Sequence, residues 1–313
     1  MNFFAKTKSK TRVLGLALGS GGARGLAHVG VLRALREADL EPDVIAGTSA
    51  GAIVAAAYAS GRLGALEGIA EELDWRLIAG LFIEFGIPRD GLLKGARVMR
   101  FLRDIIPAEN FDALRIPAAV VAADLDAEEE MVFTSGPLHH AIRASIAIPG
   151  VFTPVAHNGR LLADGGLVNP VPVSAARALG ATRVIAVDIN TRQGEFPPPD
   201  DSGEPRGMDA LLTPERLAAL NNFPLAKRAL ENWQARRERA SKEPKPANLL
   251  TVLTRSFRLC ENTITRVLLE KTPPDLLVTP AVGHVPTLDF THAQHCIEAG
   301  YEATFEALER EVE

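Results

Sequence analysis

Three short segments contain residues whose types and spacing could carry out nucleophilic chemistry, and the first surrounds a serine. Residues 47–51 read Gly-Thr-Ser-Ala-Gly, between an apolar run and an alanine-rich stretch at 50–60. A serine on a tight turn between a strand and a helix is exposed as a nucleophile, and the helix dipole stabilises negative charge that develops beside it. Gly47 and Gly51 allow the sharp turn and keep Cβ atoms away from a substrate. We therefore interpret Ser49 as a candidate nucleophile.

The second segment is a glycine-rich loop at residues 19–25, Gly-Ser-Gly-Gly-Ala-Arg-Gly, which follows an apolar run. Its glycines allow several backbone N–H groups to point into one small volume, which suits a phosphate or a developing oxyanion. The loop is no dinucleotide fingerprint, because Arg24 stands in the place of the third glycine, and no Walker loop, because no Gly-Lys-Ser/Thr follows. Since a candidate nucleophile comes soon after it, we favour an oxyanion hole over a phosphate site or a purely structural turn.

The third segment is Asp164-Gly165-Gly166, which follows an apolar pair. A carboxylate before two glycines lies on an open turn, where little separates it from a neighbouring hydroxyl. Asp-Gly alone is an ordinary turn signal, so this segment gains weight only beside the other two. The histidines lie in no recognisable motif: His28, His139, His140, His157, His284, His292 and His295.

Taken in this order, the three segments resemble those of the patatin-like phospholipases, in particular the bacterial branch related to the catalytic domain of neuropathy target esterase. Residues 144–152 (ASIAIPGVF) and 166–172 (GLVNPVP) resemble the same family. The resemblance runs from about residue 13 to residue 188 and returns weakly from residue 273 onward. It implies an α/β, three-layer patatin-like fold, with a mainly parallel central sheet and helices on both of its faces.

By position, the resemblance implies that Ser49 is the nucleophile and that Asp164 is its partner in a two-residue site. The implied chemistry is acyl transfer to water through an acyl-enzyme, in which Asp164 accepts the serine proton and later returns it to the leaving alcohol. An exposed carboxylate, with a pKa of about 3.9, is a poor base for a hydroxyl, so we expect Asp164 to be partly desolvated. The implied substrates are lipid acyl esters, phospholipids or lysophospholipids, and no cofactor or metal is expected.

The resemblance also implies an oxyanion hole in the glycine-rich loop. Its members would be the backbone N–H groups of Gly21, Gly22 and Ala23, together with the positively charged side chain of Arg24. The family's fuller pattern is Asp-Gly-Gly-Gly or Gly-x-Gly-x-x-Gly, whereas this chain has Gly19 and Ser20 in the first two places. That departure leaves the donors at Gly21 and Gly22 in place.

Two other functions are alternatives. One is a catalytically weak regulator or scaffold at a membrane surface that keeps the fold. The other is an α/β-hydrolase with a Ser-Asp-His triad, in which Ser49 and Asp164 would be completed by His284, His292 or His295. The triad is disfavoured because that fold needs several strands and an oxyanion segment before the elbow, and only 48 residues precede the serine.

Alternating strand-like and helical segments predict a mainly parallel sheet with helices on both faces. Strands are expected at 13–18, 44–46, 118–123, 131–133, 183–187 and 276–278, and helices at 28–38, 50–60 and 292–308. A further amphipathic helix is expected at 248–269, with these residues toward the core: Leu249, Val252, Phe257, Leu259, Ile264 and Val267. We expect an N-terminal tail at 1–12 and a single catalytic domain at 13–313, with a flexible or helical insertion at 191–247.

The composition favours a soluble globular protein without nucleic-acid partners. The 313 residues include 34 basic and 39 acidic side chains, for a net charge of −5, and no apolar segment is long enough to span a bilayer. Cys260 and Cys296 have no metal-binding spacing, and we expect both to be buried and reduced in the cytoplasm. The apolar run at 77–87 and the basic stretch at 236–242 leave open a peripheral contact with the inner face of a membrane.

Overall fold

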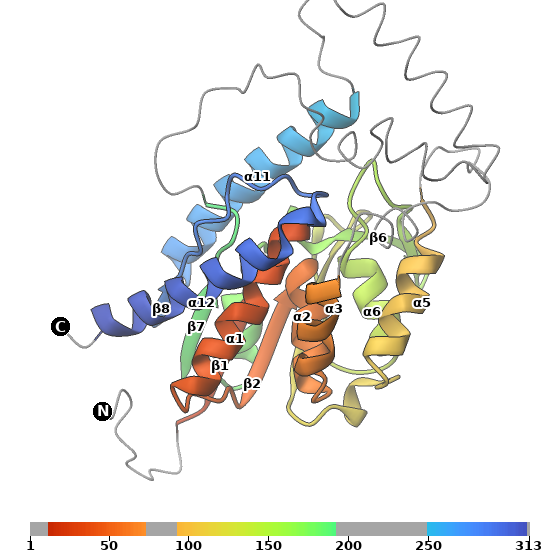
Figure 1. Cartoon of the computed structure of the whole chain (residues 1–313). Coiled ribbons are helices and arrows are strands. Elements are labelled where there is room, and N and C mark those ends of the chain that lie inside the picture. The colour runs from red at the N-terminus through yellow and green to blue at the C-terminus, as the bar shows by residue number, and fades with distance from the viewer. Residues whose placement is uncertain (1–11, 73–92, 192–248, 312–313) are drawn as a thin grey trace, which may run out of the picture.

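The computed structural model describes residues 12–72, 93–191 and 249–311 (Figure 1). Several segments discussed above lie outside the described residues. These are the expected tail up to residue 11, the apolar run at 77–87, and the expected insertion from residue 192 onward, with its basic stretch at 236–242. The elements below therefore belong to the three described ranges.

Eight strands of the described ranges form one sheet in the order β5-β6-β3-β2-β1-β7-β8, and β4 also pairs with β3. Their bounds are β1 (Leu14–Leu18), β2 (Val44–Thr48), β3 (Ala118–Asp124), β4 (Glu129–Phe133), β5 (Val155–His157), β6 (Arg160–Asp164), β7 (Arg183–Val187) and β8 (Leu276–Val278). The run from β3 to β8 is parallel, whereas β4, β5 and β6 pair antiparallel. The α/β fold with a largely parallel central sheet is confirmed, and an antiparallel edge is added to it.

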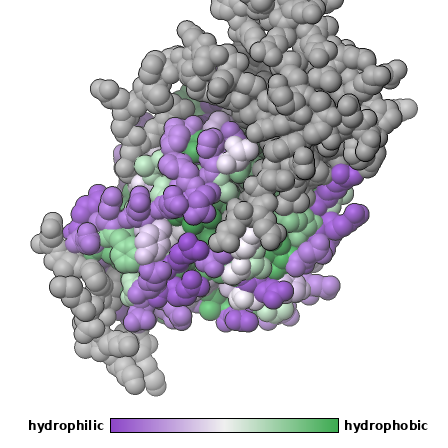
Figure 2. All heavy atoms as spheres, in the orientation of Figure 1, coloured by the Kyte–Doolittle hydropathy of each residue, from purple (hydrophilic) through white to green (hydrophobic). Residues whose placement is uncertain are grey.

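Helices lie on both faces of this sheet. Their bounds are α1 (Ala27–Glu37), α2 (Ala50–Ala59), α3 (Leu63–Glu72), α5 (Ala96–Ile105), α6 (Leu138–Ser145), α7 (Val173–Ala178), α11 (Leu249–Lys271) and α12 (Ala293–Arg310). Two 3-10 turns also matter for the site, η1 (Gly22–Leu26) and η3 (Gly165–Leu167). Figure 1 shows α1, α2 and α12 in front of the parallel strands, and Figure 2 shows mostly hydrophilic side chains over the outer surface of α12.

Alternate residues of the parallel strands face opposite layers, as the pleat of a strand requires. Leu16, Ile45 and Ile185 pack into the larger core with side chains of α1, α2 and α12. Ala17 and Ala186 point the other way, into a smaller core that contains side chains of α7. Because both faces are covered, these strands read as continuous apolar runs in the sequence.

A short hairpin, β5–β6, is not among the elements that the sequence analysis predicts. Its turn consists of Asn158 and Gly159, whose φ angles are 50° and 79°. Positive φ at both central residues is typical of the two-residue type I′ turn, for which Asn-Gly is a strong signal. The hairpin matters because Asp164 is the last residue of β6.

Helix α11 forms where the sequence predicts a helix, but the predicted orientation is wrong for part of it. The exposed fractions of three residues expected in the core are 46% for Val252, 68% for Leu259 and 52% for Val267. Phe257 and Ile264 are partly buried, and the side chain of Leu249 lies outside the described residues. Cys260, which was also expected to be buried, is exposed on this helix.

The buried side of α11 is instead polar. Glu261 and Thr265 are both buried, and α11 packs against the turn η3 that follows Asp164. The periodicity correctly predicts a helix with two unlike faces. It does not indicate which face packs against the rest of the protein. Here the polar face lies inward, against η3, and the apolar stripe faces outward.

Among the helices of the three described ranges, none combines the length and the apolar character that crossing a bilayer requires.

Candidate active site

Ser49 lies in a sharp backbone turn between β2 and α2. Its φ of 54° and ψ of −118° are outside the regions that non-glycine residues commonly adopt, and such a conformation costs about 1–3 kcal/mol. The Ser49 amide donates to Ser145 Oγ (2.8 Å), and the Ser145 hydroxyl donates to the Val121 carbonyl oxygen (2.5 Å). These two bonds tie the turn to α6 and to β3, which offsets the strain.

The four motif glycines share one property. An added Cβ would lie 2.2–2.4 Å from a neighbouring oxygen atom at each of Gly47, Gly51, Gly165 and Gly166. At Gly51 that oxygen is the carbonyl oxygen of Leu18, the last residue of β1. The elbow can therefore pack closely against the first strand and its loop only without a side chain at this position.

The Ser49 hydroxyl donates directly to Asp164 Oδ2 across 2.6 Å, and both side chains are buried. The other carboxylate oxygen, Asp164 Oδ1, accepts a hydrogen bond from the Gly166 amide (2.9 Å). Within the described ranges, neither Ser49 nor Asp164 forms a hydrogen bond with a histidine. His284 instead packs its ring against His295, with ring centroids 5.2 Å apart. The Ser49 hydroxyl therefore has a carboxylate as its hydrogen-bond acceptor.

The environment makes Asp164 a stronger base than an ordinary aspartate. The pKa of Asp164 is raised to about 8, chiefly by burial and also by the nearby Glu261 carboxylate, against the lowering effect of the hydrogen bonds from Ser49 and Gly166. The desolvation that the sequence analysis expects of this carboxylate is therefore present. A base with a pKa near neutral pH is suited to accept a hydroxyl proton.

The glycine-rich loop follows β1 and is fixed by its own backbone. The amides of Gly19 and Ser20 donate to carbonyl oxygens across 3.0 Å and 2.8 Å, and the Ala23 amide donates to the Thr287 carbonyl oxygen across 2.8 Å. Among the described residues, none accepts a hydrogen bond from the amides of Gly21 or Gly22. Because the Ala23 amide already donates to a protein oxygen, Gly21 and Gly22 are the two predicted oxyanion donors whose amides have no acceptor among the described residues.

The side chain of Arg24 binds residues that lie far from it in the sequence. Its guanidinium is completely buried, where Nη1 donates to the Val285 carbonyl oxygen (2.7 Å) and Nη2 donates to Asn190 Oδ1 (2.7 Å). The role of Arg24 as the charged member of an oxyanion hole stays a prediction. The side chain joins the loop to Asn190, which follows β7, and to Val285, which precedes α12.

Sequence reasoning missed two supporting residues that reach the loop. His28 Nε2 lies 2.7 Å from the Gly19 carbonyl oxygen, and burial lowers the pKa of this histidine to about 4, so it is neutral and donates to that oxygen. Glu261, on α11, accepts a hydrogen bond from the Ser20 hydroxyl (2.5 Å). Neither residue belongs to a local motif, so no signal in the sequence connects them to the loop.

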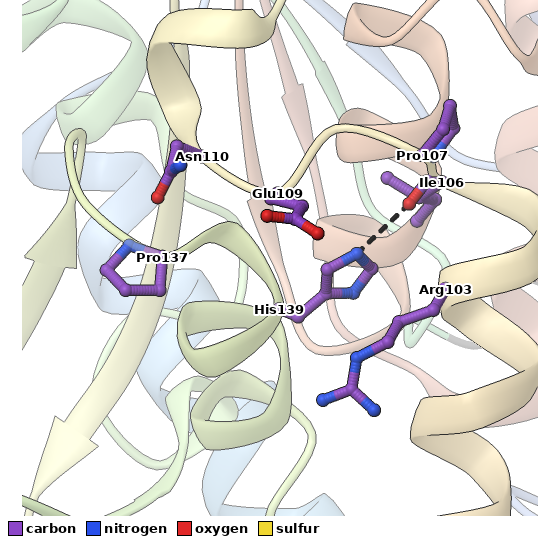
Figure 3. A pocket seen from close by; sticks show the side chains of 7 residues that line it. All are labelled: Arg103, Ile106, Pro107, Glu109, Asn110, Pro137 and His139. Atoms are coloured by element: carbon purple, nitrogen blue, oxygen red, sulfur yellow. Dashed lines mark hydrogen bonds between the residues drawn. The ribbon is translucent and has the colours of Figure 1, made fainter.

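A pocket of about 380 Å³ lies beside α5 and α6, and neither Ser49 nor Asp164 is among its lining residues (Figure 3). Its lining residues are Arg103, Ile106, Pro107, Glu109, Asn110, Pro137 and His139. Figure 3 shows the His139 ring pointing toward the Ile106 carbonyl oxygen, to which Nε2 is hydrogen-bonded (3.0 Å). The charged and amide side chains of this lining do not suit an acyl chain, which needs an apolar wall.

Comparisons with known proteins add an independent observation. The family model described as Patatin-like phospholipase matches residues 16–177, a range that contains both Ser49 and Asp164. An uncharacterized NTE family protein of Mycobacterium tuberculosis (strain ATCC 25618 / H37Rv) is 34% identical over 335 residues, which cover 94% of this chain and 91% of that protein. Patatin-like phospholipase domain-containing protein 7 of Rattus norvegicus is 33% identical over 184 residues, 57% of this chain and 14% of that protein. The crystal structure of VipD from Legionella pneumophila matches with a TM-score of 0.45 and 16% identity, over 96% of this chain and 67% of that chain.

Proposed function

This chain belongs to the patatin-like phospholipase family, among the NTE family proteins, and from that membership we propose that it is a serine acyl-ester hydrolase of lipids. The family supports a lipid hydrolase, and the proposal refines this to an enzyme of the phospholipase A or lysophospholipase type. The observation that carries the proposal is the 2.6 Å hydrogen bond from Ser49 Oγ to Asp164 Oδ2. A nucleophile within hydrogen-bond reach of its base is the recognised signature of covalent catalysis.

In the first half of the reaction, Ser49 Oγ attacks the carbonyl carbon of the ester as its proton passes to Asp164 Oδ2. The carbonyl oxygen becomes an oxyanion, and the amides of Gly21 and Gly22 are the donors we assign to it. Neither amide donates to an acceptor within the described part of the chain, which supports this assignment, because donors that stabilise developing charge need to be available before the reaction. The bond to the leaving alcohol then breaks, Asp164 returns the proton to that alcohol, and the acyl group stays on the serine.

In the second half, a water molecule attacks the acyl carbon as its proton passes to Asp164. The bond from the carbonyl carbon to Ser49 Oγ breaks, Asp164 returns the proton to the serine, and a carboxylic acid leaves. The same carboxylate therefore acts as base and acid in both halves. No third residue is needed for this cycle, which agrees with the direct contact between the two side chains.

We further propose that the lipid is met at a membrane surface, through the outer face of α11. Val252, Leu259 and Val267 recur at about seven-residue spacing and are exposed on one side of that helix. Arg255 and Arg266 are exposed near them. Apolar side chains flanked by cationic ones are typical of helices that lie at the interface of anionic bilayers. The opposite face of the same helix carries Glu261, so the surface would lie close to the site.

The catalytic domain that we propose extends from residue 13 to residue 313, well beyond the family match. Two observations support this extent. Arg24 binds the Val285 carbonyl oxygen, and Ser20 binds Glu261. These contacts join the C-terminal part of the chain to the glycine-rich loop, which supports a single unit. The proposal would fail if residues up to 190 alone hydrolysed esters at the full rate.

The test of the proposed function uses a fluorophosphonate probe, which forms a covalent bond to an activated serine oxygen with release of fluoride. We expect the wild-type chain to be labelled at Ser49, and Ser49→Ala to remain unlabelled. A catalytically weak regulator or scaffold would give no label in either protein. Peptide mapping of the modified residue separates this outcome from labelling at another serine.

A further inference from the structure

A second buried carboxyl group lies beside the proposed dyad, and the reaction described above does not use it. Glu261 comes from α11, is 3% exposed, and accepts a hydrogen bond from the Ser20 hydroxyl. Ser20 belongs to the glycine-rich loop, and its hydroxyl also accepts a hydrogen bond from Asn190 Nδ2 (3.3 Å). Glutamate is rarely buried unless it is paired, so a functional role would explain why this side chain is buried.

Glu261 also faces Asp164. The two carboxyl groups meet above Gly166, where the position of an absent Cβ is 2.4 Å from Glu261 Oε1 and 3.1 Å from Asp164 Oδ1. Any side chain at Gly166 would separate them, so the glycine of the Asp-Gly-Gly motif leaves the space in which they approach. The negative charge on one of two neighbouring carboxylates favours the protonated form of the other and so raises its pKa.

The groups that face Glu261 come from several elements. The pKa of Glu261 is raised to about 7, chiefly by burial and also by the negative charge of Asp188. The Ser20 hydrogen bond and the positive charges of Arg24 and Arg258 act to lower it. Asp164 also faces it across Gly166. Near neutral pH, Glu261 is therefore ionised in a large part of the molecules, and that charge raises the pKa of Asp164.

We propose that Glu261 is a positioning residue for the hydrolytic site, which holds the glycine-rich loop through Ser20 and strengthens Asp164 as a base through its negative charge. The proposal rests on the proposed function of Ser49 and Asp164. It assigns α11 two tasks at once, because one side chain of this helix contacts the oxyanion loop and also acts on the base. Glu261 itself does not touch the substrate.

The variant Glu261→Gln removes the charge of the side chain but keeps its shape, so it tests the two properties separately. Glutamine keeps the size of the side chain and an oxygen that accepts the Ser20 hydrogen bond, but it removes the charge beside Asp164. The pKa of Asp164 should then fall, so the proton acceptor is ionised at lower pH but is weaker once ionised. Glu270→Gln is the matched control, because Glu270 is exposed on the same helix and the substitution removes the same charge.

The experiment measures the rate of Ser49 labelling by a fluorophosphonate probe as a function of pH. For Glu261→Gln we expect the midpoint of the rising rate to move to lower pH by about one unit, the scale of interaction between coupled groups, with a lower rate on the plateau. The control should match the wild type. An unchanged midpoint would overturn the proposal even if the plateau fell, since a merely structural role changes the rate without moving the midpoint.

If Glu261→Gln does not fold, as judged by its circular dichroism and thermal unfolding, Ser20→Ala takes its place. Loss of the Ser20 hydrogen bond raises the pKa of Glu261 and so reduces its charge, and we expect a smaller shift of the labelling midpoint in the same direction. A midpoint equal to that of the wild type would count against Glu261. Failure of the wild type to label at Ser49 would instead refute the proposed function, so the two failures are distinguishable.

Discussion

Thr48 and Asp164 lie end to end beside β3, because they pair with the consecutive residues Val121 and Ala122. Strand β2 runs parallel to β3 and stops at Thr48, and β6 arrives from the opposite direction and stops at Asp164. The residue after Thr48 is the serine, so its hydroxyl meets the carboxylate at the junction of the two strands. Backbone register brings the proposed nucleophile and base together.

The first prediction concerns the proposed base. Asp164→Asn keeps the shape of the side chain but cannot accept the serine proton, so ester hydrolysis should fall by about 10²- to 10⁴-fold, the usual contribution of a positioned base. Turnover of a short-chain ester measures the loss. Asp124→Asn is the control, because Asp124 is also buried, at the end of β3, and pairs with Arg160 instead. Equal losses in both variants would show that the effect is one of folding.

The second prediction concerns pH. The pKa of Asp164 is raised to about 8, and only the ionised carboxylate accepts a proton, so the hydrolysis rate should rise as the pH increases through that value. Stability should change in the opposite direction, because the folded state holds this proton more tightly than the unfolded state and loses that advantage as the pH rises toward 8. Asp164→Asn should therefore gain thermal stability over the wild type, by more near pH 8 than under acidic conditions. A constant difference in melting temperature would contradict this linkage.

The third prediction concerns the donors of the oxyanion hole. Gly22 has a φ of 60°, and an added Cβ would lie 2.2 Å from the Thr287 carbonyl oxygen. Gly22→Ala should displace this amide, and the loss of one such donor lowers the turnover number by about 10²- to 10³-fold. Gly68→Ala provides the comparison, since Gly68 is exposed on α3 with open space around it and should gain about 1 kcal/mol in helix stability. If Gly22→Ala kept full activity, the Gly22 amide would not be a donor to the oxyanion.

The fourth prediction concerns the buried arginine. Arg24→Lys loses the planar fork that reaches both the Val285 carbonyl oxygen and Asn190, and hydrogen bonds from charged groups contribute about 1.5–3 kcal/mol each. We expect a lower free energy of unfolding and slower hydrolysis, both measured on the purified variant. Arg36→Lys should change neither, because Arg36 is largely exposed and its ion pair with Glu67 lies at the surface, where such pairs contribute little. Normal stability in Arg24→Lys would argue against this buried arrangement.

The fifth prediction concerns the membrane. Leu259→Asp places a charge in the exposed stripe of α11 and should weaken binding to vesicles that contain anionic lipid, measured by co-sedimentation. Hydrolysis of a water-soluble short-chain ester should stay unchanged, since the outer face of the helix is away from the dyad. Leu277→Asp is the control, because Leu277 is also exposed but lies on β8. Equal vesicle binding by all three proteins would refute α11 as the contact surface.

Much of the fold could be predicted because its signals are local. An apolar run, a glycine loop and a helical period follow one another at residues 14–37 and again at 44–59, and strands and helices form there. The hairpin before Asp164 also has a local signal, the Asn-Gly pair at its turn, although the expected strands do not include it. The positions of the strand ends could therefore be predicted from short stretches of sequence.

The supporting contacts could not be predicted, because they depend on which distant segment packs against the loop. The apolar stripe of α11 indicated a core-facing side, yet Leu259 is exposed and Glu261 is buried. Periodicity reports that the two faces of a helix differ, but it does not identify their neighbours. Ser145 and Arg24 are similar cases, since their hydrogen bonds reach residues 24 and 261 positions away.

The anchors of the glycine-rich loop come late in the chain, and this order matters while the protein is being made. Ser49 and Asp164 leave the ribosome well before Glu261 and Val285, which bind the loop through Ser20 and Arg24. A nascent chain thus carries a nucleophile and a base before it can hold an oxyanion. On our assignment, the enzyme becomes active only after residue 285 has been synthesised, and shorter copies do not attack the lipids around them.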